Sequence, residues 1–273
     1  MVSYPKLNVM KRILVPVGNL ENGVTNLRYA VQFASLSGAT VYLVNIYREF
    51  SKVAGLTKVN ELIIEESEAQ LKKVVDNVDT KSVEVITRAI KGDPFEALNR
   101  ISKQLDIDLM IVSPQSVDKA DEVFLGGVTG KIIKQTEIPV LVIPKDYIFR
   151  KIEVILMAFK SGQIKSDSIL DTVTSFKELF HAKLNLLHVI TPDNTDEDHN
   201  IDKRLDALKD NCKVTENATI FQGLLEHFQS NNPDMLCVIR RKRGFFKKLW
   251  EKNQIYKKEF HTSKPLLVLR GKE

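Results

Sequence analysis

The chain has little cysteine and no long apolar run, and each shortage excludes a class of protein. Its 273 residues include only Cys212 and Cys237, with no Cys-x-x-Cys pair, which argues against a disulfide framework or a zinc site. No apolar run approaches the roughly 20 residues of a membrane span. The first ten residues lack the apolar core of a signal peptide. We therefore expect a cytoplasmic protein with two reduced thiols.

The sequence also has few features that would support catalysis. Its five histidines show no metal-ligand spacing, and His188 lies inside an apolar run, where a hydrogen-bonded core histidine is the commoner case. GGVTGK, at residues 126–131, resembles part of a Walker A loop, but it is one residue short. Ile132 stands where a serine or threonine would bind magnesium. We expect no metal site and no enzyme, with weak nucleotide hydrolysis the least supported alternative.

What the chain does have is one pattern of short apolar runs that occurs twice. The hydrophobic content of 43% and charged content of 27% are typical of a globular protein, and the length suits two domains. The two copies begin with KRILVPV and KIEVILMAF and end with IPVLVIPK and KPLLVLRGK. We therefore predict two domains, residues 11–148 and a shortened copy over residues 149–273.

Within each copy, buried strands alternate with amphipathic helices. In the first copy the apolar runs predict strands over 13–17, 40–46, 83–89, 109–113 and 140–143. In the second they predict strands over 153–159, 184–190, 235–239 and 266–269, with the second helix and third strand trimmed. Helices are predicted between these strands from apolar stripes such as Leu27, Ala30, Val31 and Ala34. This alternation predicts α/β domains, each with a mainly parallel sheet between two helix layers.

These runs, in this order and twice over, resemble the universal stress protein family in its tandem form. The resemblance rests on ILVPV, LRYAVQFASLSGAT, LVNI, LLHV, DLMIVS, PVLVIP and PLLVL, and it covers residues 11–271. It implies two repeated Rossmann-like or flavodoxin-like three-layer domains, each with a five-stranded sheet, packed as a pseudo-dimer through their last strands. It also implies a role in the stress response.

The resemblance further implies a nucleotide site, which this sequence keeps only in part. Nucleotide-binding members hold ATP with an aspartate after the first strand and a Gly-x2-Gly-x9-Gly-Ser/Thr loop after the fourth, where backbone N–H groups approach the phosphates. Here Gly18 takes the aspartate position, Ser113 and Ser116 replace two glycines, and Pro114 removes a backbone donor. The predicted remnant site comprises Val17, Gly18, Ile46, Ser113, Ser116, Gly126, Gly127, Val128 and Thr129.

The second copy departs further from that pattern. Lys160 takes its aspartate position, and Arg240 and Arg243 replace the first two glycines. Arginine side chains fill the space that a phosphate loop needs, although their charge could hold a phosphate from outside. The sequence therefore argues against ATP bound there in the family's usual pose.

A basic segment, residues 240–258, holds nine lysines or arginines against one glutamate, interleaved with aromatic residues. Such a segment could contact nucleic acid, an anionic membrane face or an acidic patch on a protein. We favour packing of its aromatic residues on the sheet with the charges in solvent, which argues against a nucleic-acid partner. The candidate anion or partner surface comprises Arg240, Arg241, Arg243, Lys247 and Lys248.

Taken together, these features predict a stress-response regulator or scaffold that acts through protein contacts, with ATP binding weakened or lost and no cofactor. The alternative is an adenine-nucleotide sensor that binds ATP or AMP in the first domain only. The sequence identifies no protein partner, and it leaves open a homodimer beyond the internal pair.

Overall fold

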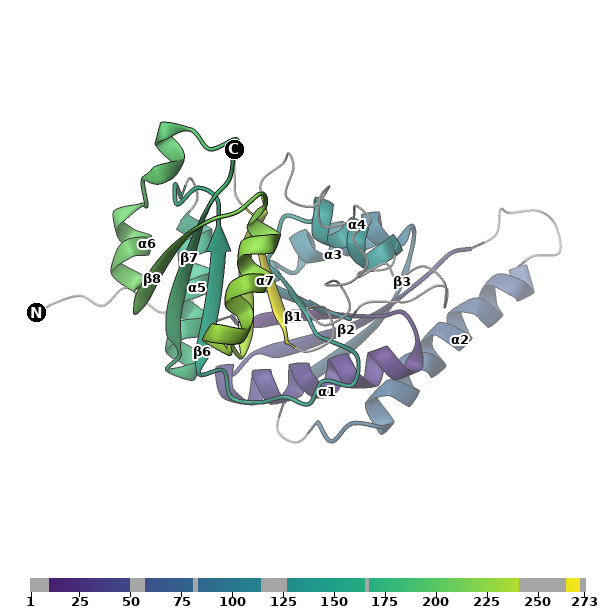
Figure 1. Cartoon of the computed structure of the whole chain (residues 1–273). Helices are drawn as coiled ribbons and strands as arrows, with labels where there is room; N and C mark the ends of the chain where they lie inside the picture. The colour runs from purple at the N-terminus through teal and green to yellow at the C-terminus, as the bar shows by residue number, and fades with distance from the viewer. Residues whose placement is uncertain are drawn as a thin grey trace, which may run out of the picture. The chain divides into compact units, whose positions relative to one another are not determined.

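The computed structural model describes residues 10–49, 57–80, 83–113, 127–164, 167–240 and 264–270 (Figure 1). The described residues divide into two compact units, one of residues 10–149 and one from Arg150 onwards. We refer to them as the first and second domains.

The first domain is built on five parallel strands in the order β3-β2-β1-β4-β5. The strands are β1 (Arg12–Val17), β2 (Thr40–Tyr47), β3 (Val85–Lys91), β4 (Leu109–Val112) and β5 (Val140–Val142). The central strands are apolar because helices cover both faces of the sheet, and Leu14 and Ile111 are fully buried.

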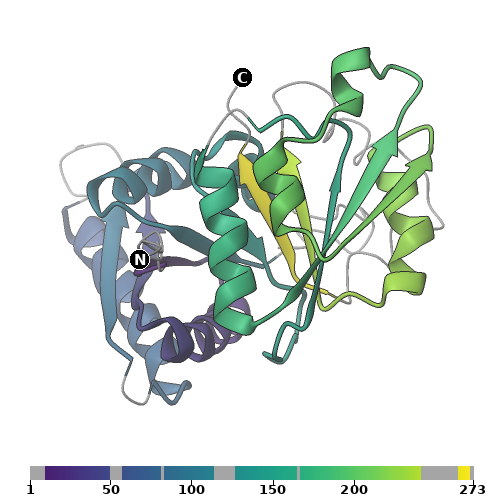
Figure 2. The same cartoon turned by 90° about the vertical axis from the view of Figure 1, so that its left-hand side faces the viewer.

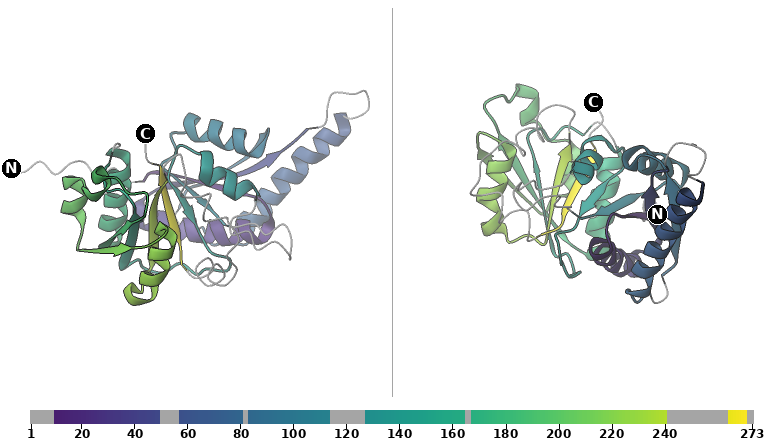
Figure 3. Two further views of the ribbon diagram at one scale, coloured as in Figure 1. Left: turned by 45° about the horizontal axis from the view of Figure 1, so that its top comes forward. Right: turned by 90° about the vertical axis from the view of Figure 1, so that its right-hand side faces the viewer.

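Four helices form the outer layers of this domain. They are α1 (Leu20–Ser37), α2 (Thr57–Asp76), α3 (Pro94–Gln104) and α4 (Gly127–Gln135). Figures 1 and 3 show α1 and α2 on one face of the strands and α3 and α4 on the other. α1 begins at the N-cap Asn19, whose side chain accepts from the backbone N–H of Asn22, and ends at Gly38 in the left-handed region.

The second domain has the equivalent strand order, β10-β9-β6-β7-β8, again with parallel pairs. Its strands are β6 (Val154–Phe159), β7 (Lys183–Ile190), β8 (Asn211–Glu216), β9 (Met235–Arg240) and β10 (Leu266–Arg270). Its helices are α5 (Asp167–Phe180), the short 3₁₀ helix η1 (Asp196–His199), α6 (Lys203–Leu208) and α7 (Ile220–Asn231). Figure 2 gives a second view of these elements.

The predicted fold class, α/β domains with parallel sheets, is confirmed. The trimmed part of the second copy nevertheless contains a strand, β8, that the sequence did not reveal. β8 (NCKVTE) lies at the edge of its sheet, and none of its residues is fully buried. Because it buries little, it lacks the apolar run by which the other strands were predicted.

Candidate functional site

The candidate site lies at the carboxyl ends of the strands of the first domain. β1 pairs with β2 on one side and with β4 on the other, so the strand order reverses at β1. In open parallel sheets this switch point leaves a crevice outside the strand ends, where ligands bind. Gly18 and Ser113 directly follow β1 and β4, and Ile46 is the last residue but one of β2.

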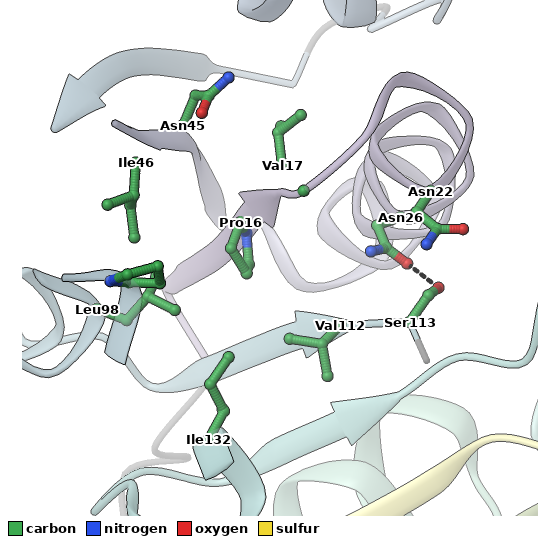
Figure 4. A pocket seen from close by; sticks show the side chains of 12 residues that line it. Pro16, Val17, Asn22, Asn26, Asn45, Ile46, Leu98, Val112, Ser113 and Ile132 are labelled. Atoms are coloured by element: carbon green, nitrogen blue, oxygen red, sulfur yellow. Dashed lines mark hydrogen bonds between the residues drawn. The ribbon is translucent and has the colours of Figure 1, made fainter. Parts of the chain in front are cut away.

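A cavity of about 220 Å³ occupies this position (Figure 4). Its described lining consists of Pro16, Val17, Gly18, Asn22, Asn26, Asn45, Ile46, Pro94, Leu98, Val112, Ser113 and Ile132. The structure therefore brings together four of the residues predicted for the remnant site, namely Val17, Gly18, Ile46 and Ser113. Elements of both helix layers complete the lining, because Asn26 comes from α1 and Leu98 from α3.

One buried hydrogen bond joins α1 to the end of β4. The Ser113 hydroxyl donates to Asn26 Oδ1 at 2.5 Å, and the two residues are only 5% and 3% exposed. Ser113 is the residue that replaces the first glycine of the family loop. Its side chain thus ties the start of that loop to α1, a contact that glycine could not make.

A second buried amide lies on the other side of β1. Asn45, in β2, stands beside Val17 in the strand register, and its Nδ2 donates to Gln70 Oε1 of α2 at 2.6 Å. Sequence reasoning missed both Asn26 and Asn45. The available signal was a polar residue within an apolar pattern, since Asn26 interrupts the stripe of α1 and Asn45 interrupts VYLVNIY.

The other predicted residues are placed in part. Gly127, Val128 and Thr129 form the first turn of α4, whose buried Ile132 lines the cavity. Ser116 and Gly126 lie outside the described residues.

At the corresponding place in the second domain, a lysine pairs with a neighbouring segment of the chain. Lys160 follows β6, and its Nζ donates to the backbone oxygen of Asp193 at 2.6 Å. Nζ also lies 3.2 Å from Asp193 Oδ2 and 3.6 Å from Asp198 Oδ2. Lys160 thus faces two carboxylates from the segment after β7, and its side chain is 26% exposed.

These contacts hold both carboxylates in their charged form. Hydrogen bonds from Thr191 and Lys160 hold the pKa of Asp193 below its usual value. Partial burial acts to raise the pKa of Asp198, but hydrogen bonds from Thr195 and Ser161 outweigh it, and the pKa is lowered.

The segment after β7 is also fixed by its backbone. Gly162 forms a β-bridge with Ile201, and the Asp202 N–H donates to Gly162 O at 3.0 Å. A Cβ on Gly162 would lie 2.8 Å from Ile201 Cα, so only glycine fits this approach. We name residues 191–202 the strap.

His188 is a core residue, as expected. It is 3% exposed, its ring stacks on Phe159, and its Nε2 lies 2.9 Å from the backbone oxygen of Lys160. Within the part of the chain that the structure describes, no group of three histidine, cysteine or acidic side chains could hold a metal ion. Both cysteines are free thiols, and burial raises the pKa of Cys237.

Of the predicted basic surface, only Arg240 is described, as the last residue of β9. Arg241, Arg243, Lys247 and Lys248 lie outside the described residues. The search for membrane spans, over the described residues alone, finds no helix that is both long and apolar enough to cross a bilayer.

Comparison with known proteins agrees with this geometry. The profile of the universal stress protein family matches residues 10–144, which is the first domain with its cavity. The first domain belongs to the universal stress protein family. Two universal stress proteins of Methanocaldococcus jannaschii are 25% and 27% identical to this chain over 144 and 154 residues. Each alignment covers 50% of this chain, and 84% and 95% of the respective relative.

The fold of the whole chain is also that of a solved member of the family. A universal stress protein from Archaeoglobus fulgidus matches 96% of this chain and 97% of its own, with a TM-score of 0.70 and 16% sequence identity. This likeness concerns the fold alone. It confirms the predicted α/β architecture across both domains.

Proposed function

We propose that the protein is a stress-response regulator or scaffold of the universal stress protein type, with weakened ATP binding and with ligand binding confined to the first domain. The observation that carries this proposal is the described lining of the cavity beside Gly18, which includes no charged side chain. The family's aspartate would stand at Gly18, and the twelve described lining residues offer no carboxylate in its place. An adenosine group therefore lacks its charged hydrogen-bond acceptor.

The second domain supports the same division of roles. Lys160 stands at the matching position, but its ammonium group is paired with Asp193 and Asp198. A ligand phosphate would have to compete with both carboxylates for that charge. The strap also lies against Gly162, beside the position that a ligand would take.

The second candidate is a nucleotide sensor that uses the first domain. It is favoured by the cavity itself, because Val17, Gly18, Ile46 and Ser113 all line it. We expect no enzymatic activity from either form, since the described lining of the cavity includes no histidine, cysteine or carboxylate that could act as a base or a metal ligand.

Restoring the carboxylate tests the proposal. Gly18 is exposed and is not among the described glycines with positive φ, so Gly18→Asp introduces no backbone strain there. By isothermal titration we expect weak ATP binding to the native chain, and at least about tenfold tighter binding to Gly18→Asp, because hydrogen bonds to charged groups are the stronger ones.

Gly18→Asn, which adds a side chain of nearly the same size without the charge, serves as the matched control and should give a smaller gain. Micromolar ATP binding to the native chain would contradict the weakened site and favour the sensor. Equal ATP affinity in Gly18→Asp and Gly18→Asn would contradict the role given to the missing carboxylate.

A further inference from the structure

The segment that follows β5 packs against α1 in the first domain. The Phe149 ring meets the Tyr29 ring of α1 edge-on, with the ring centroids 4.9 Å apart, a favourable geometry for an aromatic pair. The centroid of the Tyr147 ring lies 6.3 Å from that of Tyr29. Tyr29 is only 1% exposed, and these two rings help to cover it. We name residues 144–149 the clasp.

The hydroxyl of the covered tyrosine lacks a hydrogen bond. Among the described residues, Tyr29 Oη has no partner. Burial raises the pKa of Tyr29 well above its ordinary value, so the hydroxyl keeps its proton and stays an unused donor. A buried donor without a partner costs free energy that phenylalanine, with the same ring, would not. Opening of the clasp would return this hydroxyl to water and remove that cost.

The backbone of the clasp adds a second cost. Asp146 has a φ of 57°, in the left-handed region, which is unfavourable for most residues other than glycine. Besides the two aromatic pairs, the closed clasp has an ion pair of 3.2 Å between Lys145 and Glu21, but both side chains are exposed, so this pair contributes little. Few contacts therefore oppose two local costs, which is typical of a segment that opens by itself.

α1 joins the clasp to the cavity. Asn22, Asn26 and Tyr29 follow each other at i, i+4 and i+7, so they lie on one stripe of the helix. Asn22 and Asn26 line the cavity, whereas Tyr29 contacts the clasp. Glu21, the neighbour of Asn22, pairs with Lys145 of the clasp. A ligand that contacts Asn22 or Asn26 binds best when α1 is held in place, and the closed clasp holds it there.

We propose that the clasp is a regulatory element of the first domain, which opens from α1 as a local unit and is held closed by a ligand in the cavity. This inference rests on the proposed binding of ligands in the first domain. By linkage, the closed clasp raises the affinity of the cavity by the same factor by which the ligand favours closure.

Acetylation of the Tyr29 hydroxyl by N-acetylimidazole, read by peptide mass spectrometry, measures the opening in the full chain. We expect slow acetylation whose rate hardly changes with urea below the unfolding transition, because a local opening exposes little surface. Phe149→Ala should raise the rate at least about fivefold, since it removes the edge-on contact. Ile148→Ala, whose native side chain is 74% exposed, is the matched control and should leave the rate unchanged.

Three results overturn the clasp as a local unit. They are the absence of acetylation below the unfolding transition, a rate that rises with urea as steeply as global unfolding does, and equal rates in Phe149→Ala and Ile148→Ala.

Two further measurements test the coupling to the cavity. In Gly18→Asp, saturating ATP should slow acetylation of Tyr29 at least about threefold. In the ligand-free chain, Ser113→Ala removes the bond that ties Asn26 of α1 to the end of β4, and should raise the rate by a similar factor. An unchanged rate with bound ATP, or in Ser113→Ala, overturns the coupling. If Gly18→Asp binds no ATP, the proposed function fails and the rate in Ser113→Ala alone decides the coupling.

The hydroxyl itself is tested by Tyr29→Phe. We expect a melting temperature at least about 2 °C above that of the native chain, because the ring stays and the unpaired donor is lost. Tyr42→Phe, at a half-buried tyrosine of β2, is the control and should melt as the native chain does. A lower melting temperature in Tyr29→Phe would show that the hydroxyl has a partner, and would overturn the cost that opens the clasp.

Discussion

The two domains share a strand order but differ at the residue after their first strand. In the first domain Gly18 lies exposed at the rim of a cavity. In the second, Lys160 faces Asp193 and Asp198 of the strap. The fold therefore supplies the place for a site twice, and the two domains differ there in the residue after the first strand and in the loop after the second.

The strap requires more than the lysine. Gln163 Nε2 donates to the backbone oxygen of Asn200 at 3.1 Å, and Arg204 pairs with Asp167 and Asp202. These contacts fix the carboxyl end of the strap close to the chain after β6. Changes at its contact points should therefore affect stability in the second domain, while the equivalent changes in the first domain should not.

The largest effect should come from Gly162→Ala. Its Cβ would lie 2.8 Å from Ile201 Cα, a backbone atom that cannot move without displacing the strap. We expect the free energy of unfolding to fall by about 1–3 kcal/mol, as for other overpacked sites. Urea denaturation measures this loss in the free energy of unfolding, with Gly18→Ala as the matched control because Gly18 is exposed. Equal losses in the two variants would contradict the difference between the domains.

A smaller loss should follow from Lys160→Met. This change removes the cation from Asp198, whose side chain is 16% exposed, and leaves that carboxylate with hydrogen bonds alone. We expect a loss of about 1–2 kcal/mol in the free energy of unfolding, less than for a fully buried pair because Lys160 is partly solvated. Lys151→Met, which breaks an exposed pair with Glu153, should lose almost nothing. An equal loss of stability in Lys151→Met and Lys160→Met would mean that the contacts of Lys160 with the strap contribute no more than an exposed ion pair.

Ser113→Ala should cost about 1 kcal/mol, the usual net value of a buried hydrogen bond. It leaves Asn26 Oδ1 without the hydroxyl that donates to it. The same urea experiment measures this loss, and Ser35→Ala, on the exposed face of α1, is the control. A stability equal to that of the native chain would mean that the bond does not tie α1 to β4.

The smallest expected effect is on the stability at low pH. The folded-state pKa values of Asp193 and Asp198 are lowered, so their contribution to stability is complete above the usual carboxyl pKa of about 4. It is lost as the pH falls through their lowered values. Between pH 5 and pH 2, as the carboxylates are protonated, we expect Lys160→Met to lose less stability than the native chain does. Thermal unfolding measures the stability of both proteins as a function of pH. Parallel profiles for Lys160→Met and the native chain would contradict the contribution of Lys160 to the lowered pKa values.

The sequence revealed the buried elements well and the polar contacts poorly. Val17, Gly18, Ile46 and Ser113 were placed at one site by the resemblance to the family, and they meet there because the carboxyl ends of neighbouring parallel strands lie at one edge of a sheet. Asn26 and Asn45 could not be placed there, because each lies inside a helix or strand that periodicity assigns to the core. Their partners, Ser113 and Gln70, are distant in sequence, 87 and 25 residues away.

The second domain shows the same limit. Lys160 could be recognised as unsuited to the family's carboxylate role, but no pattern in the sequence indicated that Asp193 and Asp198 would face it. β8 was missed because a polar edge strand leaves no apolar run. Hydrophobic periodicity predicts the elements that are buried, and neither an ion pair nor an edge strand depends mainly on burial.

Native mass spectrometry of Gly18→Asp with ATP tests most directly the claim that only the first domain holds a ligand. We predict one ATP per chain, still bound when Lys160→Met is added. Two ATP molecules per chain, or a single one that is lost when Lys160→Met is added, would contradict that claim.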